Sequence, residues 1–126
     1  MKKIFNRSDP LVSIIMNCYN GEKYLKEAIR SVINQTYKNW EIIFWDNQSK
    51  DKSSQILKSF KDKRIKYYRS KSFSKLYKAR NMAINKAKGK FVSFLDVDDF
   101  WINTKLEKQI NLFQKEKNLI LVYSNV

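Results

Sequence analysis

The hydrophobic positions along the chain follow two alternating patterns: short apolar runs, and stripes at helical spacing. The apolar runs, which are typical of strands in a parallel sheet, lie at 11–16, 40–45, 65–69, 91–95 and 119–123. The helical stripes lie at 22–35, around 56–60, at 76–87 and around 106–113. Strands that alternate with helices predict an α/β fold with a mostly parallel sheet flanked by helices. We expect 91–95 to be a central strand, buried on both faces.

Three carboxylates, those of Asp96, Asp98 and Asp99, directly follow the apolar run 91–95. Ligands of open α/β sheets bind at the carboxyl ends of the strands, so these acids should converge on a crevice. Close carboxylates repel one another, and a divalent cation that prefers oxygen ligands, Mg²⁺ or Mn²⁺, would relieve the repulsion. The alternative is an acidic loop whose aspartates cap the next helix, and spacing alone does not decide between the two.

Two other predicted strands also end in polar groups. Tyr19 follows the first strand and Asp46 ends the second. Because the carboxyl ends of parallel strands meet at one edge, we expect these residues to share a cleft with the acids after 91–95. The first strand-to-helix turn holds a single glycine, Gly21, and the chain has no Gly-Lys-Ser/Thr sequence, which argues against dinucleotide and P-loop sites. Phosphates would instead be met by a metal and by basic side chains such as Arg80.

The composition narrows the chemistry further. The 126 residues predict one domain over 10–126, preceded by a tail at 1–9. The chain has no histidine, which excludes Ser-His and Cys-His nucleophilic systems, and its single cysteine excludes an intramolecular disulfide. Catalysis would therefore use carboxylates and a metal. No apolar stretch reads as a signal peptide or a membrane span, so we expect a cytoplasmic location.

The chain is strongly basic, with a formal net charge of +14. Between Lys61 and Lys90 there are twelve Lys or Arg and one acid, Asp62, interleaved with aromatic residues. Such a pattern binds single-stranded nucleic acid or an anionic membrane surface, or it is a solvated helix face with core aromatics. A nucleic-acid binder has no need for three clustered aspartates, so nucleic acid is the least expected partner. Peripheral contact with the inner face of a membrane stays open.

Several short segments occur in an order that resembles the family 2 glycosyltransferases, whose GT-A fold is Rossmann-like. They are Val12-Ser-Ile-Ile, Tyr19-Asn20, Gln35-Thr-Tyr37, Trp45-Asp-Asn-Gln-Ser49, Ala79-Arg-Asn81 and Phe94-Leu-Asp-Val-Asp-Asp99. The resemblance covers nearly the whole chain from Pro10. It implies transfer of a sugar from a nucleotide-diphosphate sugar, with a UDP-sugar as the first candidate, to a hydroxyl of a glycan or lipid-linked glycan. Cell-surface polysaccharide synthesis is the implied setting.

The resemblance also implies roles for individual residues. The nucleotide-sugar-binding positions it implies are Asn17, Tyr19, Glu22, Asp46, Arg80 and Asp96. Tyr19 would lie against the base and Asp46 would hydrogen-bond it, whereas Arg80 would neutralise the diphosphate or brace the acidic loop. Asp98 and Asp96 correspond to the Asp-x-Asp metal ligands of the family, with Asp99 as a further ligand. Tyr19 as a loop aromatic, and Asp46 or Glu22 as groups that stabilise a helix start, are the alternatives.

The chain departs from the family pattern in two respects. Its sheet is expected to be truncated after about the fifth strand, so it holds the donor-binding half only, and the catalytic base is expected beyond Val126. A donor-binding fragment without transfer activity is therefore an alternative to an active enzyme. Asn47 and Gln48 stand where the family has Asp-Gly, which weakens any inference about base or ribose contacts at position 47.

Overall fold

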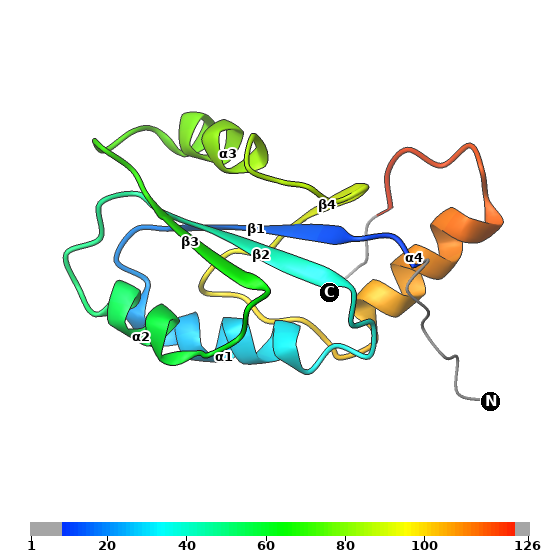
Figure 1. The fold of residues 1–126 in the computed structure, drawn as a ribbon, viewed down its shortest axis with the longest axis horizontal. Helices are drawn as coiled ribbons and strands as arrows, with labels where there is room; N and C mark the ends of the chain where they lie inside the picture. Colours follow the sequence, from blue (N-terminus) through cyan, green and yellow to red (C-terminus); the bar gives the residue numbers. More distant parts are fainter. Residues whose placement is uncertain (1–8, 123–126) are drawn as a thin grey trace.

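The computed structural model describes residues 9–122, and its four strands form one parallel sheet in the order β3-β2-β1-β4 (Figure 1). In chain order the elements are β1 (Val12–Cys18), α1 (Glu22–Ile33), β2 (Trp40–Asp46), α2 (Ser53–Ser59), β3 (Ile65–Arg69), α3 (Leu76–Ile84), β4 (Phe91–Phe94) and α4 (Lys105–Lys115). The expected α/β fold with a parallel sheet flanked by helices is confirmed.

The helices cover both faces of the sheet. In the view of Figure 1, α1 and α2 lie on one side of the strands and α3 lies on the other. The apolar stripe of α1, which includes Leu25, Ile29 and Val32, is buried because it packs on the sheet. Leu106 and Ile110 of α4 join the same core. The chain therefore folds as helix, sheet and helix layers, with the polar ends of the strands left at one edge.

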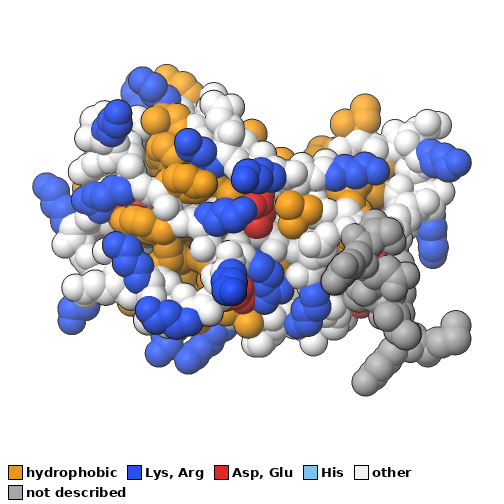
Figure 2. All heavy atoms as spheres, viewed as in Figure 1, with side chains coloured by type: hydrophobic (Ala, Val, Ile, Leu, Met, Phe, Trp, Pro, Cys, Tyr) orange, Lys and Arg blue, Asp and Glu red, His pale blue; other side chains and the backbone are white. Residues whose placement is uncertain are grey.

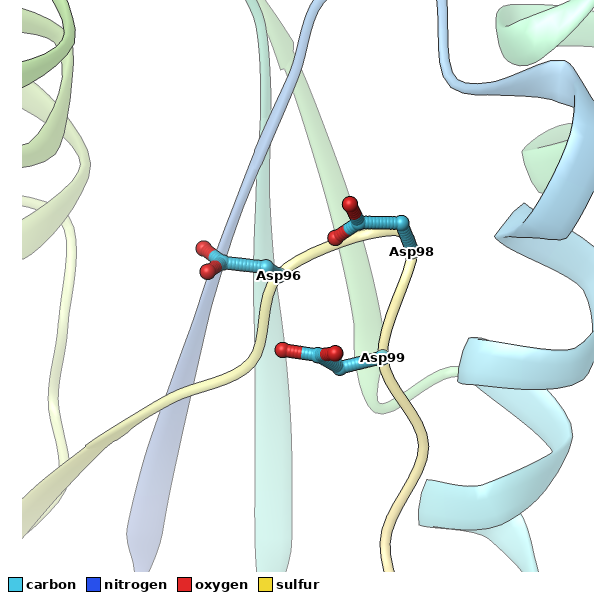
Figure 3. Close-up of side chains that lie close together, drawn as sticks. All are labelled: Asp96, Asp98 and Asp99. Atoms are coloured by element: carbon cyan, nitrogen blue, oxygen red, sulfur yellow. The ribbon is translucent and has the colours of Figure 1, made fainter.

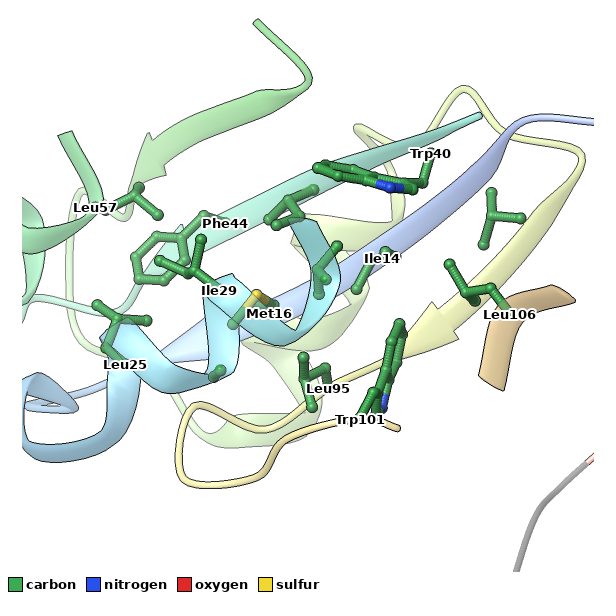
Figure 4. Close-up of a cluster of buried hydrophobic side chains, with 14 of the residues drawn as sticks. Ile14, Met16, Leu25, Ile29, Trp40, Phe44, Leu57, Leu95, Trp101 and Leu106 are labelled. Atoms are coloured by element: carbon green, nitrogen blue, oxygen red, sulfur yellow. The ribbon is translucent and has the colours of Figure 1, made fainter. Parts of the chain in front are cut away.

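The two hydrophobic cores differ in size. The larger lies between the sheet and α1, where Met16, Ile29 and Phe44 interdigitate (Figure 4). The smaller, on the α3 side, contains five buried residues, Ile15, Ile43, Trp45, Ala79 and Ala83. Every residue of β2 is buried, so β1 and β2 are the central strands that fix the positions of the loops around them.

The prediction that 91–95 forms a central strand, buried on both faces, is wrong. β4 lies at an edge of the sheet, where it pairs with β1, and its side chains alternate between partly buried and exposed. Val92 is 43 % and Phe94 48 % exposed, whereas Leu95, just beyond the strand, is buried. An apolar run predicts a strand but carries no information about which strands will lie beside it.

The prediction of a fifth strand at 119–123 is also wrong over the residues that the structure describes, 119–122; position 123 lies outside them. These residues are not in a strand, and Ile120 and Leu121 are 94 % and 76 % exposed. The backbone N–H of Leu119 bonds to the carbonyl of Glu116 in a turn after α4. An apolar run becomes a strand only when a neighbouring backbone pairs with it.

Among residues 9–122, no helix has both the length and the apolar composition that a membrane span needs.

Candidate functional site

The three aspartates after β4 converge as expected. One carboxylate oxygen from each of Asp96, Asp98 and Asp99 lies within 4.8 Å of the others, and all three side chains are exposed. A turn in which the N–H of Asp99 bonds to the carbonyl of Asp96 at 3.0 Å brings them together. In the view of Figure 3 all three carboxylates point to the left of the backbone that carries them. Three carboxylates at this spacing form a hard-oxygen donor set that suits Mg²⁺ or Mn²⁺.

Arg80 connects α3 to this acidic cluster. Its Nη2 donates to Asp96 Oδ1 at 3.1 Å, and its guanidinium lies 5.8 Å from the ring centroid of Phe94. The Arg80 and Asp96 side chains are 37 % and 57 % exposed, so the pair contributes little to the free energy of unfolding. The main effect of the pair is to hold the Arg80 guanidinium beside the three carboxylates.

An open groove of about 470 Å³ lies between α3 and β4. Its walls are Leu76, Tyr77, Arg80, Asn81, Ile84 and Phe94. The groove is apolar along most of its lining and has the Arg80 guanidinium among its polar groups. Since Arg80 also bonds to Asp96, the groove borders the acidic cluster.

Asp46 ends β2 as a fully buried carboxylate. Its Oδ1 accepts the N–H of Ser49 at 2.8 Å, and its Oδ2 accepts the Tyr67 hydroxyl at 2.7 Å and Arg69 Nη1 at 2.8 Å. Burial, reinforced by the bond to Asp46, raises the pKa of the Tyr67 hydroxyl. The carboxylate therefore holds the turn after β2 and the end of β3, which compensates for its burial. Asp46 ends β2 and Asp96 comes after β4, and these two strands lie on either side of β1.

The sequence interpretation missed Tyr67 and Arg69 as partners of Asp46. Arg69 stands opposite Asp46 in the β2–β3 ladder, and Tyr67, two residues earlier, shares its face. The signal was present in the sequence, because alternate residues of a strand point the same way and β3 ends with a cation. Using it required the register between two strands, which the sequence pattern does not provide.

Asn17 and Tyr19, at the end of β1, have groups that the fold leaves available. Within the described residues, the buried Nδ2 of Asn17 has no hydrogen-bond partner. Tyr19 is 51 % exposed and meets Phe73 edge-to-face, with the ring centroids 5.0 Å apart. Both residues lie at the carboxyl edge of the sheet, where a ligand would sit.

Glu22 links the first two loops at this edge. Its Oε2 accepts the N–H of Lys52 at 3.0 Å, and its own N–H donates to Asp51 Oδ2 at 3.0 Å. The N–H of Asn20 donates to Ser49 Oγ at 2.9 Å. These reciprocal bonds tie 20–22 to 49–52. Glu22 therefore connects the start of α1 to the turn before α2, and its role toward a nucleotide stays a prediction.

The two residues that depart from the family pattern hold the loop before α3. Asn47 Nδ2 donates to the carbonyl of Ser74 at 2.7 Å, and Asn47 Oδ1 accepts the N–H of Ser74 at 3.0 Å. Gln48 Nε2 donates to the carbonyl of Ser70. Gln48 has a φ of 68°, a left-handed conformation that favours glycine. This left-handed backbone explains why the family pattern has glycine at position 48. In this chain the hydrogen bond from the Gln48 amide offsets part of the conformational cost of a residue other than glycine.

A parallel α/β domain with clustered aspartates at the carboxyl edge of the sheet agrees with the GT-A fold that the sequence resemblance implies. The family model described as "Glycosyl transferase family 2" matches residues 13–126. The chain therefore belongs to glycosyl transferase family 2, as the sequence resemblance implies.

Curated relatives extend well beyond this chain. The chain is 44% identical over 118 residues to an uncharacterized glycosyltransferase of Haemophilus influenzae, covering 92% of this chain and 47% of that protein. It is 43% identical over 117 residues to the Escherichia coli protein named UDP-Glc:alpha-D-GlcNAc-diphosphoundecaprenol beta-1,3-glucosyltransferase WfgD, covering 93% of this chain and 46% of that protein. The chain thus spans about half the length of these relatives.

Solved structures place the fold in the same class. TarS 1–349 of S. aureus in complex with UDP-GlcNAc has a TM-score of 0.79 and 30% identity, covering 82% of this chain and 31% of that one. The mannosyltransferase PcManGT of Pyrobaculum calidifontis, solved with GDP-Man and Mn²⁺, has a TM-score of 0.69 and 22% identity, covering 75% of this chain and 29% of that one. The GT-A fold is confirmed, and the roles of individual site residues stay predictions.

Proposed function

We propose that this chain binds a nucleotide-diphosphate sugar, with a UDP-sugar as the first candidate, for transfer to a hydroxyl of a glycan or lipid-linked glycan. The observation that carries the proposal is the convergence of Asp96, Asp98 and Asp99 beside Arg80 at the carboxyl edge of the sheet. WfgD is named for a UDP-glucose donor and a diphosphoundecaprenol-linked acceptor, and TarS was solved with UDP-GlcNAc. The name of WfgD supports a lipid-linked acceptor, and the TarS complex supports a UDP-sugar donor. The setting that we propose is cell-surface polysaccharide synthesis.

Asp98 and Asp96 would hold Mg²⁺ or Mn²⁺, with Asp99 as a further ligand. When bound, the cation neutralises the charge that develops on the leaving nucleoside diphosphate. Arg80 places a second positive charge next to Asp96, within reach of the same diphosphate. The acidic loop would therefore hold the diphosphate end of the donor.

The base of the nucleotide would lie toward β1 and β2. Tyr19 offers a half-exposed ring for it, and Asn17 offers an amide donor that the fold does not use. Asp46 is fully buried and accepts three hydrogen bonds in the structure, so a hydrogen bond to the base would require the side chains that cover it, such as that of Arg69, to move. Glu22 is exposed at the same edge and stays a candidate for nucleotide contact.

No residue of 9–122 is assigned as the catalytic base, which the family resemblance puts beyond Val126. The sugar would be transferred with inversion by an acceptor hydroxyl that attacks from the side opposite the diphosphate. Donor binding without transfer is the alternative for this chain alone. A lipid-linked acceptor, as in the name of WfgD, would fit a cytoplasmic enzyme that is peripheral at the inner face of the membrane.

The test is calorimetric titration of UDP, then GDP and dTDP, with Mn²⁺ or with EDTA. We expect UDP to bind only with the metal, and Asp98→Ala to weaken binding at least tenfold. Glu27→Ala is the matched control, because it removes one exposed carboxylate from α1, away from the site. Absence of binding for all three nucleotides, or equal binding by Asp98→Ala, would overturn the proposal.

A further inference from the structure

A basic surface without acids surrounds the start of α3. Residues 63–95 contain eleven Lys or Arg and no Asp or Glu. Figure 2 shows basic and apolar side chains interleaved over the region of α3. Four of these cations, those of Arg64, Lys66, Arg69 and Arg80, form ion pairs with acids outside the segment. Among the described residues, no ion pair engages the three lysines at 71, 75 and 78, so a partner of these lysines should be negatively charged.

Exposed apolar side chains stand among these cations. Phe73 is 61 %, Leu76 53 % and Tyr77 67 % exposed, in the loop after β3 and the first turn of α3. Lys71, Lys75 and Lys78, which flank them, are exposed as well. We call these six residues the 71–78 surface. Apolar groups framed by lysines on one short segment combine the two forces that hold a protein at an anionic lipid surface.

We propose that the 71–78 surface docks the protein on an anionic lipid bilayer. Phe73, Leu76 and Tyr77 enter the boundary between headgroups and acyl chains, while the three lysines contact lipid phosphates. Single-stranded nucleic acid is the competing anionic partner, since it stacks its bases on aromatic rings. The structure favours lipid because Leu76 has no ring on which a base could stack, whereas acyl chains contact an exposed leucine as readily as an aromatic ring.

Hydrogen bonds and a ring contact connect the 71–78 surface to the edge of the site. Ser74 exchanges two hydrogen bonds with Asn47 at the end of β2, and Phe73 packs against Tyr19. Arg80 lies one helical turn beyond Leu76, so both line the groove that borders Asp96. Docking would therefore bring the acidic cluster close to the bilayer. This consequence, though not the docking itself, rests on the proposed function, because it brings the donor site to a lipid-linked acceptor.

The test is co-sedimentation of the chain with vesicles of phosphatidylcholine alone or mixed with phosphatidylglycerol. The variant Lys71→Gln/Lys75→Gln/Lys78→Gln should bind the anionic vesicles about a hundredfold more weakly, at roughly fivefold for each lysine. Its control is Lys23→Gln/Lys26→Gln/Lys58→Gln, which makes the same change in net charge on exposed positions of α1 and α2. The control should bind nearly as the unchanged chain does.

A second pair of variants tests the apolar part. Leu76→Ser/Tyr77→Ser should lose at least tenfold in binding to anionic vesicles, whereas Ile102→Ser/Leu112→Ser, at similarly exposed positions, should lose little. Equal losses for the members of either pair, or equal binding to both kinds of vesicle, would overturn the docking proposal. So would tighter binding to a single-stranded oligonucleotide than to anionic vesicles. Titration of UDP without vesicles reports on the donor site separately, so the two proposals fail independently.

Discussion

Gly21 lies so close to Val97 that a Cβ on Gly21 would stand 2.7 Å from Val97 Cγ2. Val97 is the residue between Asp96 and Asp98, and Gly21 precedes α1. The turn after β1 thus supports the acidic loop after β4. Real Cβ atoms do not approach other atoms this closely, and valine has a short side chain with little freedom to move away. A side chain at position 21 would displace the loop.

We predict that Gly21→Ala weakens Mn²⁺-dependent UDP binding at least fivefold, because displacement of Val97 separates the carboxylates. Val97→Ala removes the methyl group that collides, so the double variant Gly21→Ala/Val97→Ala should recover most of the affinity. Calorimetric titration of all three variants checks this. If the double variant binds as weakly as Gly21→Ala does, contact with Val97 is not the reason for the glycine.

Arg80 offers a test of the cation beside the acidic cluster. Arg80→Gln should lower the affinity for UDP about tenfold, since the diphosphate loses one positive partner. The free energy of unfolding should change by less than about 0.5 kcal/mol, because the pair with Asp96 is exposed. Arg30→Gln, at an exposed position on α1, is the control and should bind UDP normally. A large loss of stability with unchanged UDP affinity would assign Arg80 to structure alone.

Near the amino ends of the strands, away from the candidate site, the buried carboxylate of Glu41 joins several segments. It is 3 % exposed and accepts Ser13 Oγ at 2.6 Å, the N–H of Lys88 at 2.8 Å and Lys66 Nζ at 2.7 Å. Glu41→Gln should cost about 2–4 kcal/mol in the free energy of unfolding, because it leaves the donors without a charged acceptor. Urea unfolding measures this, with Glu27→Gln as an exposed control. A loss below 1 kcal/mol would contradict the prediction.

The same carboxylate predicts a pH dependence. Burial alone would raise the pKa of Glu41, but the hydrogen bonds from Lys66, Ser13 and the N–H of Lys88 outweigh it, and the pKa is lowered overall. The folded state therefore binds this proton more weakly than the unfolded chain does. The stabilisation is fully present above the ordinary glutamate pKa of about 4.3 and is lost as the pH falls through the lowered value. As the pH is lowered from 6 to 3, the urea concentration at the midpoint of unfolding should fall less steeply for Glu41→Gln than for the unchanged chain.

Tyr37 predicts the opposite trend at alkaline pH. Burial, with a smaller effect of Asp9, raises the pKa of its hydroxyl to about 12. The folded state binds this proton more tightly, so its stabilisation is present below the ordinary tyrosine pKa of about 10 and is lost as the pH rises to about 12. Between pH 9 and pH 11, Tyr37→Phe should lose about 1.4 kcal/mol less stability than the unchanged chain. Equal losses would show that Tyr37 ionises normally.

The sequence predicted those features of the fold that depend on residues close together along the chain. The strand at 65–69 and the helix that begins at Glu22 follow from local periodicity, and both are present. The clustering of Asp96, Asp98 and Asp99 followed from their spacing after a strand. The edge position of β4 did not, because the order of strands is decided by pairing between distant segments.

The hydrogen-bond partners of Asp46 could not be predicted from the sequence either. The sequence placed this acid at the end of a strand, but its hydrogen bonds to Tyr67 and Arg69 depend on the β2–β3 register. The reciprocal bonds between Asn47 and Ser74 likewise join segments 27 residues apart. Contacts of this kind decide whether a predicted ligand group is free or already engaged.

The small core beneath α3 has a consequence for amide hydrogen exchange. Ala79 and Ala83 are the buried residues of this helix, and alanines bury little surface. Elements held by few buried contacts open at low free energy and lose protection first, so the amides of α3 should exchange faster than those of β1 and β2. Each opening would carry Arg80 away from Asp96. The proposed donor site thus has one stable side, formed by the strand ends, and one side, formed by α3, that opens more readily.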